Sequence, residues 1–123
     1  MDVEELEVYK KAVAAADAIF ALTERPSFGR DPELRQQLRK SSGRIQANLQ
    51  EGSGQTTDRH YGEYVARARG SSKEVKAHLR RALGYRYISE SDYQKHWSMF
   101  DEIAKMLTGL KKHLDESDWK NRG

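Results

Sequence analysis

The stretch YQKHWSMFDEIAKMLTGLKKHL, residues 93–114, decides the fold. Its apolar residues recur at steps of four, three, three, four, three and four: Tyr93, Trp97, Phe100, Ile103, Leu107, Leu110 and Leu114. Because an α-helix completes a turn in about 3.6 residues, these side chains fall on one helical face. The pattern predicts an amphipathic helix over residues 90–114, followed by a polar, frayed tail over residues 115–123.

Three earlier segments share this periodicity and predict helices over residues 4–23, 32–51 and 58–83. The stripe of the first helix consists of Leu6, Tyr9, Val13, Ala16 and Phe20, widened by Val8, Ala12, Ile19 and Leu22. The stripe of the second consists of Leu34, Leu38, Ile45 and Leu49. The stripe of the third consists of Tyr61, Tyr64, Val65, Ala68, Ser72, Val75, Leu79 and Ala82. No segment alternates as a strand would. Short links make consecutive helices antiparallel neighbours. The sequence therefore predicts an all-α fold, one domain over residues 1–123, built as an antiparallel up-and-down four-helix bundle.

Several helix ends carry local signals. Asp31 and Pro32 suit the cap and the first turn of the second helix. Ser89 and Asp92 resemble a capping box at the start of the fourth. The glycines expected to end helices are Gly52, Gly54 and Gly84.

Composition limits the class of protein. The 22 Leu, Ile, Val and Phe residues are few for a chain of 123 residues, so an oligomeric interface is expected to bury additional surface. The chain has no cysteine, which excludes disulfides and thiol chemistry. Its acidic N-terminus lacks the apolar region of a signal peptide, and no apolar run is long enough to span a membrane. We expect a cytoplasmic protein with no membrane partner.

The sequence offers no catalytic or metal-binding constellation. The histidines His60, His78, His96 and His113 lack the spacing of a metal site, and the Glu-x-x-His pairs of di-iron bundles are missing. The Gly52–Gly54 loop lacks the lysine of a phosphate-binding loop. We therefore expect no enzyme activity, no catalytic residue, no metal and no cofactor.

Charge is unevenly distributed among the four helices. The first and fourth are acidic, whereas residues 59–86 hold eight basic side chains against two acids. One interpretation is that these charges pair with the acidic helices, within or between subunits. The other is a basic face that contacts phosphates, because the guanidinium fork suits phosphate oxygens. The candidate nucleic-acid contacts are Arg67, Arg69, Lys73, Lys76, Arg80 and Arg81.

Gly43 and Gly70 lie inside predicted helices, where glycine costs roughly 1 kcal/mol relative to alanine. Close packing between the second and third helices is the simplest explanation. Contact with another subunit or a ligand is the alternative.

Three stretches together resemble a known family. They are Leu6–Ala12 with Phe20–Thr23, then Gln37–Lys40 with Asn48–Gly52, and Ala68–Ser71 with Glu74. In order and over nearly the whole chain, they resemble the four-helix bundle family of 23S ribosomal RNA intervening-sequence proteins. This family is distantly related to the accessory protein of diversity-generating retroelements, which binds nucleic acid. The resemblance implies a ring-like homopentamer. The chain departs from the family's pattern at Arg44, Gln46, Gln50 and Lys76.

The shared motifs suggest a polar cluster. A glutamate near a helix C-terminus is unfavourable for the helix dipole, so Glu51 is expected to have a cationic partner. Arg39 or Arg69 is the candidate partner, in a cluster with Asn48 and Ser71. The leading functional hypothesis is a non-enzymatic homo-oligomer, a pentamer by the resemblance, that acts as a nucleic-acid-associated or assembly module and binds RNA through its third helix. The alternative is a structural or protein-binding oligomer without a nucleic-acid role.

Overall fold

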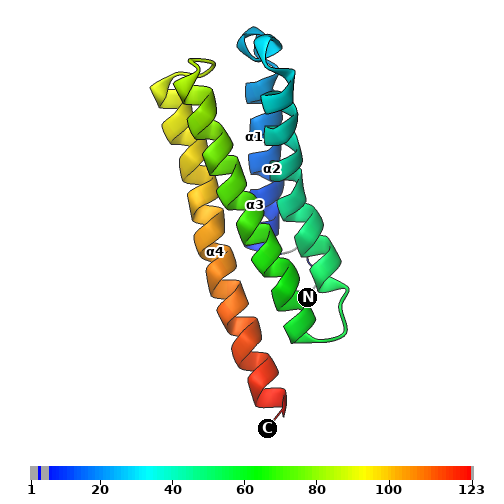
Figure 1. Cartoon of the computed structure of the whole chain (residues 1–123). Coiled ribbons are helices and arrows are strands. Elements are labelled where there is room, and N and C mark those ends of the chain that lie inside the picture. The colour runs from blue at the N-terminus through cyan, green and yellow to red at the C-terminus, as the bar shows by residue number, and fades with distance from the viewer. Residues whose placement is uncertain (1–2, 4–5, 123) are drawn as a thin grey trace.

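A computed structural model describes residue 3 and residues 6–122, with side chains described as far as residue 119. Four long helices run up and down: α1 (Glu7–Thr23), α2 (Pro32–Ser53), α3 (Asp58–Gly84) and α4 (Glu90–Arg122) (Figure 1). A short 3-10 helix, η2 (Pro26–Arg30), links α1 to α2. No strand occurs among the described residues. The predicted all-α, antiparallel four-helix bundle is confirmed.

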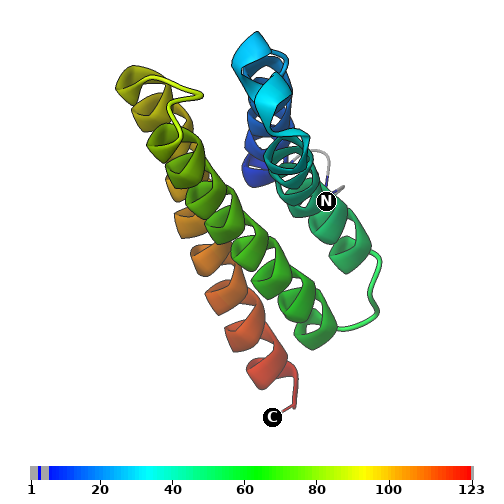
Figure 2. The same cartoon turned by 45° about the horizontal axis from the view of Figure 1, so that its top comes forward.

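Each of the four helices packs against two others. α3 packs against both α2 and α4, and α1 closes the bundle through contacts with α2 and α4. Turning the molecule shows α1 beside α2 and α3 beside α4, as two adjoining layers (Figure 2). No helix in the described part of the chain combines the length and apolar character that crossing a bilayer requires.

The core face of α1 differs from the predicted one. The buried stripe is Val8, Ala12, Ala15, Ile19 and Leu22. The stripe expected to lead the core is only partly buried, and Phe20 at its end is 53% exposed. Because α1 is apolar on most of its circumference, it carries two stripes of similar spacing. Periodicity identified the helix and could not choose between them.

Gly52 lies at a close contact between α2 and α3. The helix continues through this glycine to Ser53 instead of ending at residue 51. A Cβ at Gly52 would lie 2.8 Å from Tyr64 Cβ and 2.9 Å from Tyr61 Cδ1, so no larger residue fits without moving α3. At Gly43 and Gly70 an added Cβ would meet nothing within 4 Å. The prediction that these two glycines mark close helix packing is therefore wrong within this chain.

The segment expected to fray is helical as far as Arg122, whereas Gly123 lies outside the described residues. Contacts with the start of α3 hold it. Ser117 Oγ donates a 2.6 Å hydrogen bond to Asp58 Oδ2, and Lys111 Nζ pairs with Asp115 Oδ1 at 2.7 Å beside Gly62. The final turns of α4 extend past the other helices (Figure 1).

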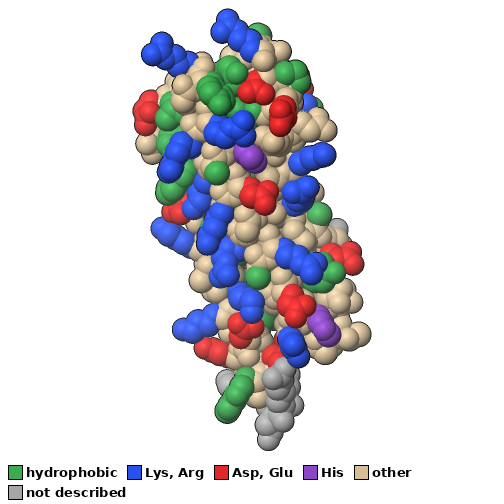
Figure 3. Space-filling model, in the orientation of Figure 1, with side chains coloured by type: hydrophobic (Ala, Val, Ile, Leu, Met, Phe, Trp, Pro, Cys, Tyr) green, Lys and Arg blue, Asp and Glu red, His purple; other side chains and the backbone are tan. Residues whose placement is uncertain are grey.

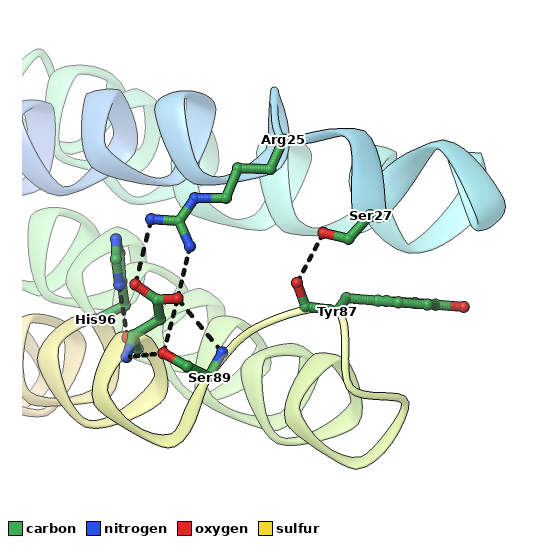
Figure 4. Close-up of polar contacts among 6 residues, drawn as sticks. Arg25, Ser27, Tyr87, Ser89 and His96 are labelled. Atoms are coloured by element: carbon green, nitrogen blue, oxygen red, sulfur yellow. Dashed lines mark hydrogen bonds and ion pairs between the residues drawn. The ribbon is translucent and has the colours of Figure 1, made fainter.

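The opposite end of the bundle is fastened by contacts between two links (Figure 4). Arg25 donates to both carboxylate oxygens of Asp92, at 2.5 and 3.2 Å. Ser27 Oγ donates to the Tyr87 carbonyl at 2.7 Å, and the fully buried ring of Phe28 lies 5.6 Å from that of Tyr87. The sequence had predicted only a short link between the first two helices here. Burial of Phe28 explains why the link forms η2.

Two predicted helix caps are confirmed. Asp31 Oδ1 accepts a 3.0 Å hydrogen bond from the Leu34 N–H at the start of α2. At the start of α4, the Ser89 hydroxyl accepts from the Asp92 N–H at 3.0 Å, and the Asp92 carboxylate accepts from the Ser89 N–H at 3.3 Å. Asp92 therefore caps a helix and anchors Arg25 at the same time.

Candidate nucleic-acid interface

The predicted phosphate contacts lie along the outer side of α3. At about 100° per residue, Arg69, Lys73, Lys76 and Arg80 form a row on the side next to α4. Lys76 fixes this direction, because its Nζ lies 3.1 Å from Asp101 Oδ1 on α4. Arg81 turns toward α2, where its Nη1 donates to Gln37 Oε1 at 3.0 Å.

Most of these cations have no acidic partner. Within the part of the chain that the structure describes, none of Arg67, Arg69, Lys73 and Arg80 forms an ion pair. The Arg67 guanidinium lies over the Tyr64 ring, 4.6 Å from its centroid, a contact that leaves its N–H groups available. We call Arg67, Arg69, Lys73, Arg80 and Arg81 the basic α3 surface.

Lys76 differs from the other five predicted contacts. It is half-buried, pairs with Asp101 and lies 4.8 Å from the centroid of the Trp97 ring. The hydrogen bond from Lys76, followed by that from Lys105, lowers the pKa of the Asp101 carboxyl. Lys76 is thus already engaged inside the bundle and is the weakest candidate for a phosphate contact.

Charge pairing inside the bundle accounts for a minority of the basic residues of α2 and α3. Arg39 Nη2 binds Glu24 at 2.9 Å, and Arg39 Nε donates to Thr23 Oγ1 at 2.8 Å. Arg44 approaches Glu74 only to 3.8 Å. In the view of Figure 3, which looks onto α2 and α3, Lys and Arg side chains gather in a band over α3 with acidic side chains scattered among them.

The predicted polar cluster does not form. Glu51 is exposed, and in the described part of the chain its carboxylate takes part in no ion pair. Arg39 lies about 13 Å along α2 from Asn48, at 1.5 Å per residue, and is held by Glu24 instead. Arg69 and Ser71 lie on α3, and in the described part of the chain neither forms a hydrogen bond with Asn48. The motif glycine Gly52, rather than Glu51, has a clear structural role.

The predicted phosphate contacts lay on α3 alone, although α2 is also basic and contributes to this face. Lys40 and Arg44, four residues apart, line a cavity together with Glu74 and His78 of α3, which are also four residues apart. The matching spacing was visible in the sequence. The helix register that makes the two pairs face each other was not.

Groups that could perform chemistry are dispersed. No cluster of three or more His, Asp or Glu side chains suited to a metal ion occurs in the described residues. Hydrogen bonding, first of all from Arg25, lowers the pKa of Asp92 to about 2, and the hydrogen bond to Glu102 raises the pKa of Lys11. These shifts arise from ion pairs at separate places along the bundle.

Comparison with known proteins agrees with this architecture. No protein with a curated functional description matches the chain. A crystal structure from Bacteroides thetaiotaomicron, described as a protein of unknown function from the S23 ribosomal protein family, has a TM-score of 0.78 and 20% sequence identity. The match covers 85% of this chain and 98% of that one, which shows a shared fold. The model of the family described as 23S rRNA-intervening sequence protein matches residues 4–109, so this chain, with its four-helix bundle, belongs to that family.

Proposed function

We propose that this protein is a non-enzymatic, homo-oligomeric module that binds RNA through the basic α3 surface. The observation that carries the proposal is the set of four cations, Arg67, Arg69, Lys73 and Arg80, that have no acidic partner in the described part of the chain. An unpaired cation can release counterions from a phosphate backbone on binding, which favours association. The family's description also names a ribosomal RNA sequence, and such a partner suits a cytoplasmic location.

The length of the basic α3 surface suits a nucleic acid. From Arg69 to Arg80, the row next to α4 rises roughly 16–17 Å at 1.5 Å per residue, while Arg81 faces α2. A duplex carries a phosphate charge about every 1.7 Å along its axis, so several phosphates lie within reach of such a row. Four of the five residues are arginines, whose planar guanidinium can donate two hydrogen bonds to one phosphate. Contacts of this kind reach phosphate oxygens rather than base edges, so the expected recognition is of backbone and shape.

Self-association is supported by the second apolar stripe of α1. Tyr9, Val13, Ala16 and Phe20 follow the heptad steps of a helix–helix seam, yet the first three are only partly buried and Phe20 is exposed. Two adjoining hollows of about 250 and 480 Å³ lie between this stripe and α2, and both reach Gln46. Gly43 borders the first of them, so a helix of a second copy could approach closely there. A homopentamer is the assembly that the family resemblance favours.

The placement of the titratable groups supports a role without catalysis. The pKa shifts of Lys11, Asp92 and Asp101 each trace to a different ion pair: Lys11 of α1 with Glu102, Asp92 with Arg25, and Asp101 with Lys76 of α3. Acid–base catalysis needs such groups to converge on one substrate position. The dispersed arrangement supports a binding role.

The salt dependence of RNA binding tests the proposal. Binding of a structured RNA is measured between about 50 and 200 mM salt for the wild type and for Lys73→Gln with Arg80→Gln. Each lost phosphate contact should reduce the slope of log K against log salt by about 1. The matched control is Lys95→Gln with Lys112→Gln, two exposed α4 lysines, which should leave the slope unchanged. Absence of RNA binding at about 50 mM salt would instead favour a structural or protein-binding oligomer.

A further inference from the structure

A cavity of about 200 Å³ opens between α2 and α3, at the border of the basic α3 surface. One face of α2 and two residues of α3 line it: Gln37, Lys40, Ser41, Arg44, Glu74 and His78. Sites for drug-sized molecules have about 300–1,000 Å³, and one water takes about 30 Å³ of liquid. The cavity therefore fits a single small group, such as one tetrahedral oxyanion.

The charge around the cavity favours an anion. Lys40 and Arg44 line it, and Arg81 stands at its edge, held by the hydrogen bond to Gln37. Glu74 is the one carboxylate in the lining. Its distance of 3.8 Å from Arg44 exceeds the roughly 2.7–2.9 Å of a charge-assisted hydrogen bond, and both side chains are more than half exposed. Arg44 is therefore free to turn toward a stronger acceptor.

His78, which also lines the cavity, has a ring nitrogen without a hydrogen-bond partner. Its Nδ1 is enclosed and has no hydrogen-bond partner, whereas Nδ1 of His96 lies 2.7 Å from the Asp92 carbonyl oxygen. Burial, and then the charge of Arg81, lower the pKa of His78, while Glu74 raises it. An anion in the cavity would offset the charges of Lys40, Arg44 and Arg81, and it would favour the protonated, donating imidazolium.

We propose that this cavity binds one phosphate group through Lys40, Arg44 and His78. The inference rests on the proposed RNA-binding function and sharpens it. A backbone phosphate held in the cavity fixes the position of the RNA on α2 and α3, and the basic α3 surface contacts the neighbouring phosphates. Arg44 supplies the bidentate contact, Lys40 a point charge, and His78 a donor whose strength grows as pH falls.

Glu74 should oppose phosphate binding, whereas Lys40 and Arg44 should favour it. Its carboxylate competes with phosphate for Arg44 and repels the ligand. Glu74→Gln should therefore tighten phosphate binding, whereas Lys40→Gln and Arg44→Gln should weaken it. A structural role for the four side chains predicts no such opposite pair of effects.

The first experiment titrates the full chain with inorganic phosphate at pH 6.5 and constant ionic strength, with the histidine ring signals followed by NMR. The His78 signals should shift saturably, with smaller changes at His60, His96 and His113. The double variant of Lys40→Gln and Arg44→Gln should lose at least about tenfold in affinity, because it removes two charge-assisted contacts to the phosphate. The exposed Lys112→Gln serves as the matched control. Melting curves check that every variant is folded.

The second experiment adds a short structured RNA to the phosphate-loaded protein. Displacement of phosphate, seen as reversal of the His78 shift, supports the full proposal. Phosphate binding that RNA does not displace overturns the RNA role and leaves a site for free phosphate. RNA binding without any His78 response, or with equal responses in the wild type and the double variant, overturns the cavity proposal while the proposed function stands.

Discussion

Arg25 and Asp92, 67 positions apart, join the two links at one end of the bundle through a bidentate ion pair. The pair connects the end of α1 to the start of α4, and the same carboxylate caps α4 through Ser89. Among the described residues it is the one ion pair that ties the segment between α1 and α2 to α4. The pair is therefore a sensitive point for the stability of the bundle.

We predict that Asp92→Ala lowers the free energy of unfolding at pH 7 by about 1–2 kcal/mol, through loss of the cap and of a half-exposed ion pair. The folded-state pKa of Asp92 is about 2, below its ordinary value of 3.8. The stabilisation should therefore be complete above about pH 4 and should disappear as pH falls toward 2. Urea titrations of both proteins at several pH values measure the difference.

Glu116→Ala is the matched control, since Glu116 is an exposed carboxylate of α4. It should change stability by less than about 0.5 kcal/mol. A difference between Asp92→Ala and the wild type that persists unchanged at pH 2 would contradict the role assigned to the carboxylate.

The glycines of α2 and α3 should respond in opposite directions to alanine. Gly70→Ala should raise the free energy of unfolding by up to about 1 kcal/mol, because the added methyl meets no atom and alanine favours the helix. Gly52→Ala should lower it by about 1–3 kcal/mol, because the methyl would overlap Tyr61 and Tyr64. Chemical denaturation of the two variants tests the pair. Stabilisation by Gly52→Ala would show that α2 and α3 can separate at no cost.

These glycines illustrate what could be predicted from sequence. Periodicity and breakers were enough for the four helices and their order, because both depend on local spacing. Which glycine faces a neighbouring helix depends on the rotation of each helix, and the one expected to end α2 proved to be the tightly packed one. The length of α4 was underestimated because its last turns are held by a distant residue, Asp58.

The same limit applies to the candidate site: its residues could be predicted from sequence, but their partners could not. The basic composition of α3 identified its exposed cations directly. The partner of each charge depends on register between helices, so sequence could not show that Lys76 is engaged with Asp101 while Lys73 is not. The cavity that joins Arg44 to His78 required both helices in place.

Arg86 occupies a backbone conformation that favours glycine. Its φ is +64°, and the end of α3 closes with the Tyr87 N–H donating to the Ala82 carbonyl and the Arg86 N–H to the Leu83 carbonyl, both at 2.9 Å. α3 ends at Gly84 as expected, and Arg86, two residues later, occupies the glycine position of a Schellman motif.

Replacing Arg86 by glycine should therefore stabilise the protein by about 1 kcal/mol, through relief of left-handed strain. Arg86→Ala keeps the strain and separates this effect from loss of the side-chain charge. Thermal melts of the wild type and of the two variants give their melting temperatures, and the glycine variant should have the highest. Equal melting temperatures for the glycine and alanine variants would refute the strain argument.

Phe20 provides the sharpest test of self-association. Its ring is 53% exposed at the end of the outward stripe of α1, with the Arg39 guanidinium 4.1 Å from its centroid. Phe20→Glu would place a charge in the proposed seam, while Arg39 stays near enough to pair with it inside the protomer. We therefore expect a folded helical protein of lower mass in solution, measured by light scattering.

Ala21→Glu, one position away and outside the hollows along α2, should leave the mass unchanged, because it alters an exposed residue that lines neither hollow. If both variants keep the wild-type mass, the α1 stripe is not the surface through which copies associate; if the wild type is itself monomeric, the homo-oligomeric part of the proposed function fails, and the exposed stripe needs another partner.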